Sequence, residues 1–499
     1  MKRSFIILAI TALGMTFCTS PHKEKTEVKQ DKTYMVICFD VEDYTSPDSV
    51  GMDDIPKWEA EIMTGEGVTG TFFVIGEKAR MLEKRGRTDV IQAMAKHDIG
   101  SHTNYGSIHP TVTEILEKAG WDDGIATMLK NETAGFDDLE RIFGRRPANL
   151  ARHGGSYGPQ LVAALSEMNA GYVYSPVSLP GHNAVWFCNT LNFHGEGDFG
   201  FFDDAYWNDS LFNPMLGALD TLIPKNIAGA DVVAFFANHP SKVRSIQFWD
   251  FNYYKGANPG PSEWKTPELR PSETMKTAQK NFRRLIRYMK GRDDIELTTY
   301  REMKKLYGNQ KIGISAEKLG AVADRILAEN AVVTDEYYSP AEIFTALAEA
   351  LSTYGKTGKL PENLTVRRPF GPLTMPAENP GITTAGKNEV LTLASSALDS
   401  VLNTNHLPAT RELNGHAIGT GSLMALFCKM YQEIRNGTVP ARLDIVSFPA
   451  YPTENAEQIL KEVAACKSWP VHREDLDMTG LIEMTKLQLW TLKPALISE

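Results

Sequence analysis

The sequence is poor in cysteine and has no excess of positive charge. Five cysteines occur in 499 residues, and 62 acidic side chains outnumber 52 basic ones, which gives a net charge of −10. The cysteines form no CxxC pair, and their wide spacing argues against a cysteine zinc site or a dense disulfide framework. We expect Cys38 and Cys188, which lie in apolar runs, to be buried thiols. The acidic balance predicts no nucleic-acid binding.

The N-terminal apolar stretch, Phe5 to Phe17, is too short to span a bilayer as a stable helix. It follows Lys2 and Arg3, as in a signal peptide, and Cys18 comes directly after it. This order predicts a signal peptide over 1–17, an acylated Cys18 and a polar tether over 18–33. We therefore expect an exported envelope protein that is lipid-anchored to a bacterial membrane. Simple secretion and an uncleaved anchor remain alternatives.

Strand-like runs alternate with amphipathic stretches from residue 34 to residue 308, which predicts an α/β domain with a parallel sheet. The expected strands are Met35–Asp40, Gly70–Ile75, Ile99–Thr103, Ala148–Arg152, Tyr172–Ser175, Val185–Asn192, Val232–Asn238 and Ile295–Thr298. Seven or eight strands over this length suit a distorted (β/α) barrel. Such barrels carry their active sites at the C-terminal ends of the strands.

Residues 309–499 differ from this pattern and contain a weak internal repeat. Each unit has an apolar helical stretch, a short polar link and then Leu-Pro or Val-Pro before a strand-like run. The units begin at Ala341, Val390 and Leu423. Units of this kind share one core when they stack, so we expect a smaller, non-catalytic α+β accessory domain.

Carboxylates and imidazoles follow two of the expected strands. Asp40, Glu42 and Asp43 end the first strand, and His102 and His109 follow the third. Because side chains alternate along a strand, Asp40 and Glu42 are expected to share a face. Carboxylates with two imidazoles are a typical ligand set for a divalent metal, and a carboxylate there is also a candidate general base.

Later strands contribute further candidates. Arg152 ends a strand and is a candidate to orient an acid by a bidentate contact. Gly155 and Tyr157 follow it in a glycine-rich loop that allows a close approach to substrate. His239 ends another strand and is a candidate general acid. Trp249 lies among aromatic residues that either stack on sugar rings or pack the loops.

Taken in order, these motifs resemble those of the NodB-homology polysaccharide deacetylases, carbohydrate esterase family 4. The resemblance covers residues 34–308 and rests on Phe39-Asp40-Val41-Glu42-Asp43, Gly70-Thr71-Phe72-Phe73-Val74-Ile75-Gly76, His97-Asp98-Ile99-Gly100-Ser101-His102-Thr103, Arg152 and His239. Two positions depart from the family pattern. Gly106 stands where the second imidazole is usual, and Gly154 stands where a proline is usual. The C-terminal units faintly resemble pseudomurein-binding repeats, which would imply wall-glycan binding.

The resemblance implies hydrolysis of N-acetyl or O-acetyl groups on a polysaccharide or peptidoglycan-like glycan. In that scheme Asp40 is the base, and Glu42 or Asp43 binds a divalent metal, most often zinc, with two histidines. His239 protonates the leaving group. Two alternatives stay open: a catalytically impaired deacetylase-like lipoprotein that only binds glycan, and a hydrolase of another acyl or amide substrate.

Overall fold

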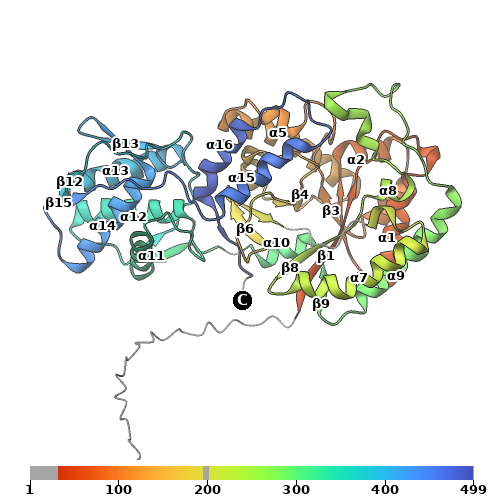
Figure 1. Ribbon diagram of the computed structural model, residues 1–499, viewed down its shortest axis with the longest axis horizontal. Coiled ribbons are helices and arrows are strands. Elements are labelled where there is room, and N and C mark those ends of the chain that lie inside the picture. Colours follow the sequence, from red (N-terminus) through yellow and green to blue (C-terminus); the bar gives the residue numbers. More distant parts are fainter. Residues whose placement is uncertain (1–31, 195–201, 309, 498–499) are drawn as a thin grey trace, which may run out of the picture. The chain divides into compact units, whose positions relative to one another are not determined.

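The computed structural model describes residues 32–194, 202–308 and 310–497 (Figure 1). The expected signal peptide, Cys18 and nearly all of the tether lie outside the described residues. No helix in the described ranges combines the length and the apolar character needed to cross a membrane.

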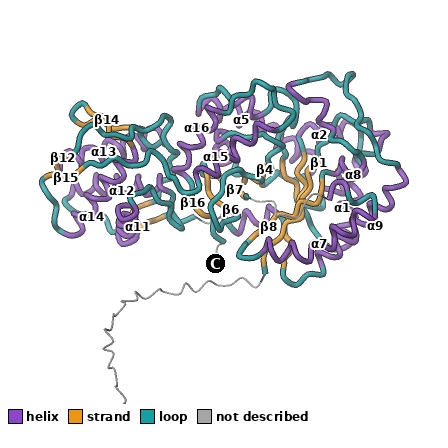
Figure 2. The backbone as a smooth tube through the Cα atoms, in the orientation of Figure 1, coloured by secondary structure: helices purple, strands orange, loops and turns teal. Residues whose placement is uncertain are grey.

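A ten-stranded sheet forms the first part of the protein (Figure 2). Its order is β16-β6-β7-β5-β4-β3-β2-β1-β8, and β9 also pairs with β1. The strands that run in one direction and have a parallel neighbour are β1 (Thr33–Val41), β2 (Thr71–Val74), β3 (Asp98–Ser101), β4 (Asn149–Ala151), β5 (Gly171–Val173), β7 (Thr190–Phe193), β8 (Val232–Asn238) and β9 (Ile295–Thr298). β6 (Ala184–Phe187) runs antiparallel to both of its neighbours, β7 and β16 (Lys493–Pro494). This curved, largely parallel sheet confirms the expected distorted (β/α) barrel.

One expected strand is instead a hairpin. Residues 185–192 divide into β6 and β7 at Cys188 and Asn189, which have φ values of 48° and 60°. A left-handed pair of residues reverses the chain, so β7 pairs with β6 on one side and with β5 on the other.

Helices connect the strands and cover the sheet (Figure 1). They are α1 (Asp54–Glu66), α2 (Gly76–Lys84), α3 (Thr88–Met94), α4 (Val112–Leu116), α5 (Trp121–Phe143), α6 (Pro159–Glu167), α7 (Asp209–Ile227), α8 (Pro240–Arg244), α9 (Met275–Lys290) and α10 (Tyr300–Leu306). β1 alternates between two cores. Met35, Ile37 and Phe39 pack with residues of α1 and α9, whereas Val36 and Cys38 pack with Phe73, Ala151 and Tyr174. The even-numbered side chains of β1 therefore face the interior of the barrel.

The expected repeat units share one core in the second part of the protein. Each unit has one helix followed by a short strand: α12 (Pro340–Thr357) with β11 (Asn363–Thr365), α13 (Lys387–Thr404) with β13 (Thr410–Leu413), and α14 (Thr420–Asn436) with β15 (Arg442–Asp444). α11 (Ala316–Glu329) packs on α14, and β10 (Gly313–Ser315), β12 (Thr384–Gly386) and β14 (His416–Gly419) complete three two-stranded sheets.

The last segment returns to the barrel, which differs from the expected accessory region of 309–499. α15 (Ala456–Ala465) and α16 (Thr479–Gln488) contribute to one apolar cluster with residues of α5 and α6, and β16 extends the large sheet beside β6. Hydrophobic burial along this surface joins residues 456–494 to the barrel. Cys38, Cys188, Cys428 and Cys466 are buried thiols, as expected for Cys38 and Cys188.

Candidate active site

Asp40 and Glu42 lie at the C-terminal end of β1, where its alternation directs both side chains to one face. Both are buried, and each offers a carboxylate oxygen within 4.8 Å of the other and of a His239 ring nitrogen. The predicted pairing of these two acids is therefore present. It places two carboxyl groups in the barrel interior at the edge where parallel strands end.

His102 follows β3, and its two ring nitrogens have different surroundings. Nδ1 lies 3.2 Å from the carbonyl oxygen of Ala151, which can only accept, so Nδ1 carries the proton and donates. Nε2 lies 3.2 Å from Glu42 Oε1 and 3.5 Å from Asp40 Oδ2. In this tautomer a nitrogen lone pair faces two carboxylate oxygens.

His153 follows β4 and supplies a second imidazole. Its Nε2 bonds to Ser107 Oγ at 3.1 Å, and its Nδ1 lies 3.2 Å from Glu42 Oε1 without hydrogen-bond geometry. The His102 and His153 rings meet edge to face with centroids 4.7 Å apart. Sequence reasoning missed this residue, although it is next to Arg152.

Glu42 is held from the opposite side by Trp249. Glu42 Oε2 accepts a hydrogen bond of 3.0 Å from the indole Nε1, so Oε1 is left facing the two imidazoles. Burial opposes ionisation of Glu42, but the charge of His239 and the neighbouring imidazoles of His102 and His153 outweigh it and hold the pKa of Glu42 well below its usual range. Glu42 is therefore a buried anion in a fixed orientation.

These groups fit a divalent metal ion. Glu42, His102 and His153 offer ligand atoms that all lie within 4.8 Å of one another. Burial is the main cause that lowers the pKa of His102 to about 4, so a second proton on Nε2 is disfavoured. The neighbouring carboxylates of Asp40 and Glu42 therefore gain no positive charge from this ring, and a metal cation would supply it. Nitrogen and carboxylate ligands in this number suit zinc and similar ions, and Ala151, Ser107 and Trp249 supply the bonds that orient them.

His239 ends β8 on the other side of Asp40. Its Nδ1 lies 2.9 Å from Asp203 Oδ2, its backbone N–H donates to Asp203 Oδ1, and its Nε2 is 4.0 Å from Asp40 Oδ2. Burial opposes the charged ring, but Asp203, Glu42 and Asp40 outweigh it and raise the pKa of His239 to about 10. The protonated ring is thus a proton donor beside Asp40.

Asp203 was not predicted as a site residue. It lies in a short 3-10 turn, Phe202–Asp204, rather than at the end of a strand. The acidic pair Asp203-Asp204 within an aromatic connection was the available signal, but nothing in the sequence placed it beside His239.

Two predicted metal ligands lie outside the cluster. His109 has both ring nitrogens engaged, Nδ1 with Glu114 Oε2 at 2.7 Å and Nε2 with the carbonyl of Tyr253 at 3.0 Å. Asp43 Oδ1 accepts bonds from the backbone N–H groups of Thr45 and Ser46, which makes it a turn-stabilising side chain. The geometry favours His153 in place of His109, and Glu42 in place of Asp43.

The predicted substrate contacts also need correction. Tyr157 is fully buried, and its hydroxyl bonds to Thr485 Oγ1 at 3.1 Å, so it does not face a ligand. Trp249 is fully buried as well and orients Glu42 instead of stacking on a sugar. Gly155 does line a pocket, where a Cβ would collide with the carbonyl of Cys466.

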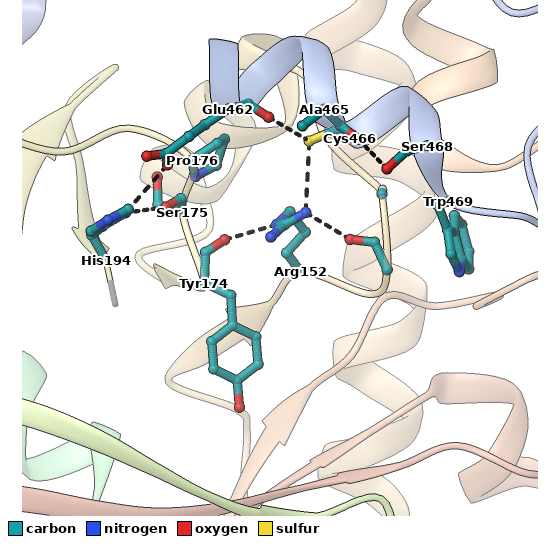
Figure 3. A pocket seen from close by; sticks show the side chains of 12 residues that line it. Arg152, Tyr174, Ser175, Pro176, His194, Glu462, Ala465, Cys466, Ser468 and Trp469 are labelled. Carbon is teal, nitrogen blue, oxygen red and sulfur yellow. Dashed lines mark hydrogen bonds and ion pairs between the residues drawn. The ribbon is translucent and has the colours of Figure 1, made fainter. Parts of the chain in front are cut away.

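Arg152 lines the same pocket (Figure 3). Its Nε donates to the carbonyl of Tyr174 and its Nη1 to the carbonyl of Gly154, each at 2.8 Å. Arg152 therefore does not orient an acid of the cluster as predicted. Within the described residues it bonds to carbonyl oxygens and, at 3.6 Å, to Cys466 Sγ.

No protein-family model and no curated protein matches the chain. Solved structures do. They include a family 4 acetyl xylan esterase from Clostridium thermocellum in complex with cobalt, at 15% identity, a TM-score of 0.28 and coverage of 55% of this chain and 92% of that one. The Puue allantoinase matches at 12% identity and a TM-score of 0.36, over 56% and 91% of the two chains. A mutant of a carbohydrate esterase family 4 pseudoenzyme matches at 12% identity and a TM-score of 0.30, over 54% and 67%. At these scores the chemistry has to be argued from the chain's own residues.

Proposed function

We propose that the protein is a metal-dependent hydrolase that removes acetyl groups from an N-acetylated or O-acetylated glycan. One observation carries the proposal: two imidazoles and a carboxylate converge beside a second carboxylate and His239, whose ring is held by Asp203. The acetylated glycan as substrate class comes from the resemblance of the sequence motifs to polysaccharide deacetylases.

The residues divide into metal ligands and acid–base groups. Glu42, His102 and His153 would hold the ion, which when bound would polarise the acyl oxygen and lower the pKa of a water molecule. We propose zinc as that ion because nitrogen and oxygen ligands in this number suit it. Asp40 lies beside this set, with Oδ2 3.5 Å from His102 Nε2, and is placed to accept a proton from the attacking water.

His239 completes the reaction on the other side of Asp40. When the bond between the acyl carbon and the sugar nitrogen or oxygen breaks, the leaving atom needs a proton. His239 Nε2 supplies it, while Asp203 holds the ring through Nδ1 and stabilises its charged form. Acetate and a free amine or hydroxyl group on the sugar are the products.

The test combines metal analysis with acetate release. The purified chain should contain about one equivalent of divalent metal, lose activity on chelation and regain it when zinc is restored. Acetate release should be measured on chitooligosaccharides, acetylated xylan and peptidoglycan fragments. A chain that binds metal but releases acetate from none of them would contradict the proposed reaction, and a chain without metal would contradict the proposed centre.

We also propose that the protein is held at a membrane by lipid on Cys18. A Cys18→Ala variant should then move to the soluble fraction, because the lipid and not the protein surface provides the attachment. Membrane fractionation with detergent extraction measures this. A variant that remains in the membrane would point to an uncleaved anchor.

A further inference from the structure

A pocket of about 490 Å³ has walls from distant parts of the chain (Figure 3). One wall comes from the barrel: Arg152, Gly154, Gly155, Tyr174, Ser175, Pro176 and His194. The other comes from the returning C-terminal segment: Glu462, Ala465, Cys466, Ser468 and Trp469. Its volume lies within the range of about 300–1,000 Å³ typical of small-molecule sites.

The pocket and the cluster share a boundary. His153, a proposed metal ligand, lies in sequence between Arg152 and Gly154, which both line the pocket. The Trp469 ring meets the His153 ring edge to face with centroids 5.0 Å apart. The pocket wall therefore adjoins the cluster at His153.

Arg152 is fixed in the pocket wall but has no counter-charge. The bonds of Nε and Nη1 to backbone carbonyls hold the guanidinium plane in one orientation. Throughout the described residues no carboxylate pairs with Arg152, and no hydrogen bond uses its Nη2. A half-buried cation in a preorganised orientation, with unused donors, is suited to recognise an anionic oxygen pair.

The acid in the pocket wall does not neutralise Arg152. Glu462 Oε1 accepts a bond of 2.8 Å from Gln458, and Oε2 lies 3.9 Å from His194 Nδ1. Oε1 is thus engaged by Gln458, whereas His194 Nδ1 donates to the carbonyl oxygen of Ser175 at 2.8 Å; within the described residues no ion pair joins Glu462 to Arg152. The positive charge of Arg152 remains available to a ligand.

Trp469 adds an apolar surface to this charged pocket. Its side chain is partly exposed and lines the pocket, so an indole and a guanidinium border the same space. An indole suits the apolar face of a sugar ring, and a guanidinium suits a carboxylate. A sugar that carries a carboxylate meets both requirements at once.

We propose that this pocket binds the carboxylate of an acidic sugar unit next to the unit that carries the acetyl group. Its place on the glycan rests on the proposed function. The recognition of the acid does not, because Arg152 and Trp469 need no acetyl hydrolysis to bind it. The substrate class is then an acetylated glycan that contains uronic acid or a similar acidic sugar.

The experiment compares two sugars that differ in charge alone. Methyl β-glucuronide and its uncharged amide have the same ring and no acetyl group, so the full-length, metal-loaded chain does not turn them over. Binding is measured by calorimetric titration or ligand-observed NMR at low and high salt. We expect the acid to bind about tenfold more tightly than the amide, as one charge-assisted contact provides, and to lose that preference at high salt.

Two arginine variants identify the residue responsible. Arg152→Gln should abolish the preference for the acid. Arg442→Gln should keep it, because Arg442 is an exposed arginine that bonds to Thr384 and does not line the pocket. If Arg152 had a structural role only, its replacement would weaken the binding of the acid and of the amide equally. Arg152→Lys, which keeps the charge but loses the planar fork, serves if the glutamine variant does not fold.

The outcomes separate this inference from the proposed function. Equal binding of acid and amide by the wild-type chain, or a preference that survives in Arg152→Gln, would overturn the acidic-sugar site. A chain that prefers the acid through Arg152 yet releases no acetate from any substrate would retain this site and contradict the deacetylase function. A chain that releases acetate but binds the acid and the amide equally would support the deacetylase function and contradict the acidic-sugar site.

Discussion

Two buried glutamates, one in each part of the protein, have opposite surroundings. Glu342 at the start of α12 has both carboxylate oxygens within 2.9 Å of Lys493 Nζ and also accepts a bond from the Ser339 N–H. Glu42 in the barrel faces the ring nitrogens of His102 and His153. The first is a buried ion pair with its cation in the chain, and the second is arranged around a cation that has to be bound.

The charge balance around each glutamate supports this difference. Asp40, Glu42 and Asp203 surround His239 and raise its pKa. Three acids against one imidazolium leave an excess that a divalent cation would offset. Around Glu342, Lys493 and Arg368 already supply the positive charge. In this protein the buried carboxylate that faces lone pairs of neighbouring imidazoles is therefore the candidate for a functional site, because structural ion pairs are also buried.

The largest expected effect comes from removing a ligand of the proposed metal. His153→Gln takes away one of the two imidazoles, and we expect a loss of metal affinity greater than about 100-fold, since even partners of ligands contribute about 10–100-fold. Acetate release should fall with metal content. Elemental analysis and competitive chelator titration measure the change.

His109→Gln is the matched control for that variant. His109 bonds to Glu114 and Tyr253 rather than to the cluster, so the variant should keep its metal. If His109→Gln loses metal and His153→Gln retains it, the assignment of the second imidazole is wrong.

The next effect should come from Asp40→Asn. The amide cannot take a proton from water, so we expect turnover to fall by about 10²–10⁴-fold, the usual contribution of a general base. Metal content and the unfolding midpoint should change little, because Glu42, His102 and His153 remain. Stopped acetate assays with metal analysis test this, and unchanged turnover would exclude Asp40 as the base.

A smaller effect is expected from Asp203→Asn, and it should appear in the pH profile. Asp203 helps to raise the pKa of His239, so its neutralisation should lower that pKa. A general acid works only while protonated, and activity should therefore be lost at a lower pH than in the wild type. Asp204→Asn is the control, because Asp204 is exposed and pairs with Lys242 and Arg270. An alkaline limb of kcat/KM that moves in neither variant would contradict the role of Asp203.

The alternation of side chains along a strand predicts the pairing of Asp40 with Glu42. Applied to β4 as well, it would also have predicted His153. Asp40 and Glu42 continue the series of even-numbered residues whose side chains face the barrel interior from β1. In β4, Ala151 faces the barrel interior while Leu150 packs under the helices. The same alternation places His153 with Ala151 and directs Arg152 away from the cluster. The rule favours His153, whereas the prediction of His109 rested on its place after the third expected strand, close to His102 in the sequence.

Other features depend on contacts between distant residues. His109 is held by the carbonyl of Tyr253, which lies 144 residues away in the sequence. The helical pattern of residues 456–465 indicates a helix but not that it packs on the barrel, and so Trp469 could not be placed beside His153. Removing all of 309–499 would therefore take away one wall of the pocket as well as β16. We expect such a truncation to lose activity even on small substrates.

The smallest effect on activity should come from Glu342→Gln, which tests the other member of the comparison. The glutamine can still cap α12, but Lys493 keeps a buried charge without its anion. We expect the free energy of unfolding in urea to fall by about 3 kcal/mol, the usual result of breaking a buried pair, while metal content and turnover per folded molecule stay unchanged.

Burial already lowers the pKa of Lys493, and the loss of Glu342 should lower it further. A lysine whose pKa is lower in the folded than in the unfolded state destabilises the fold most at a pH where it is protonated. The loss of unfolding free energy in Glu342→Gln should therefore shrink as the pH rises and Lys493 deprotonates. Glu349→Gln, on the same helix but paired with Arg367 at the surface, should cost less than about 1 kcal/mol at any pH. If Glu342→Gln reduced metal content as His153→Gln does, the two buried glutamates would not be independent, and the contrast between a satisfied ion pair and an ion-binding cluster would fail.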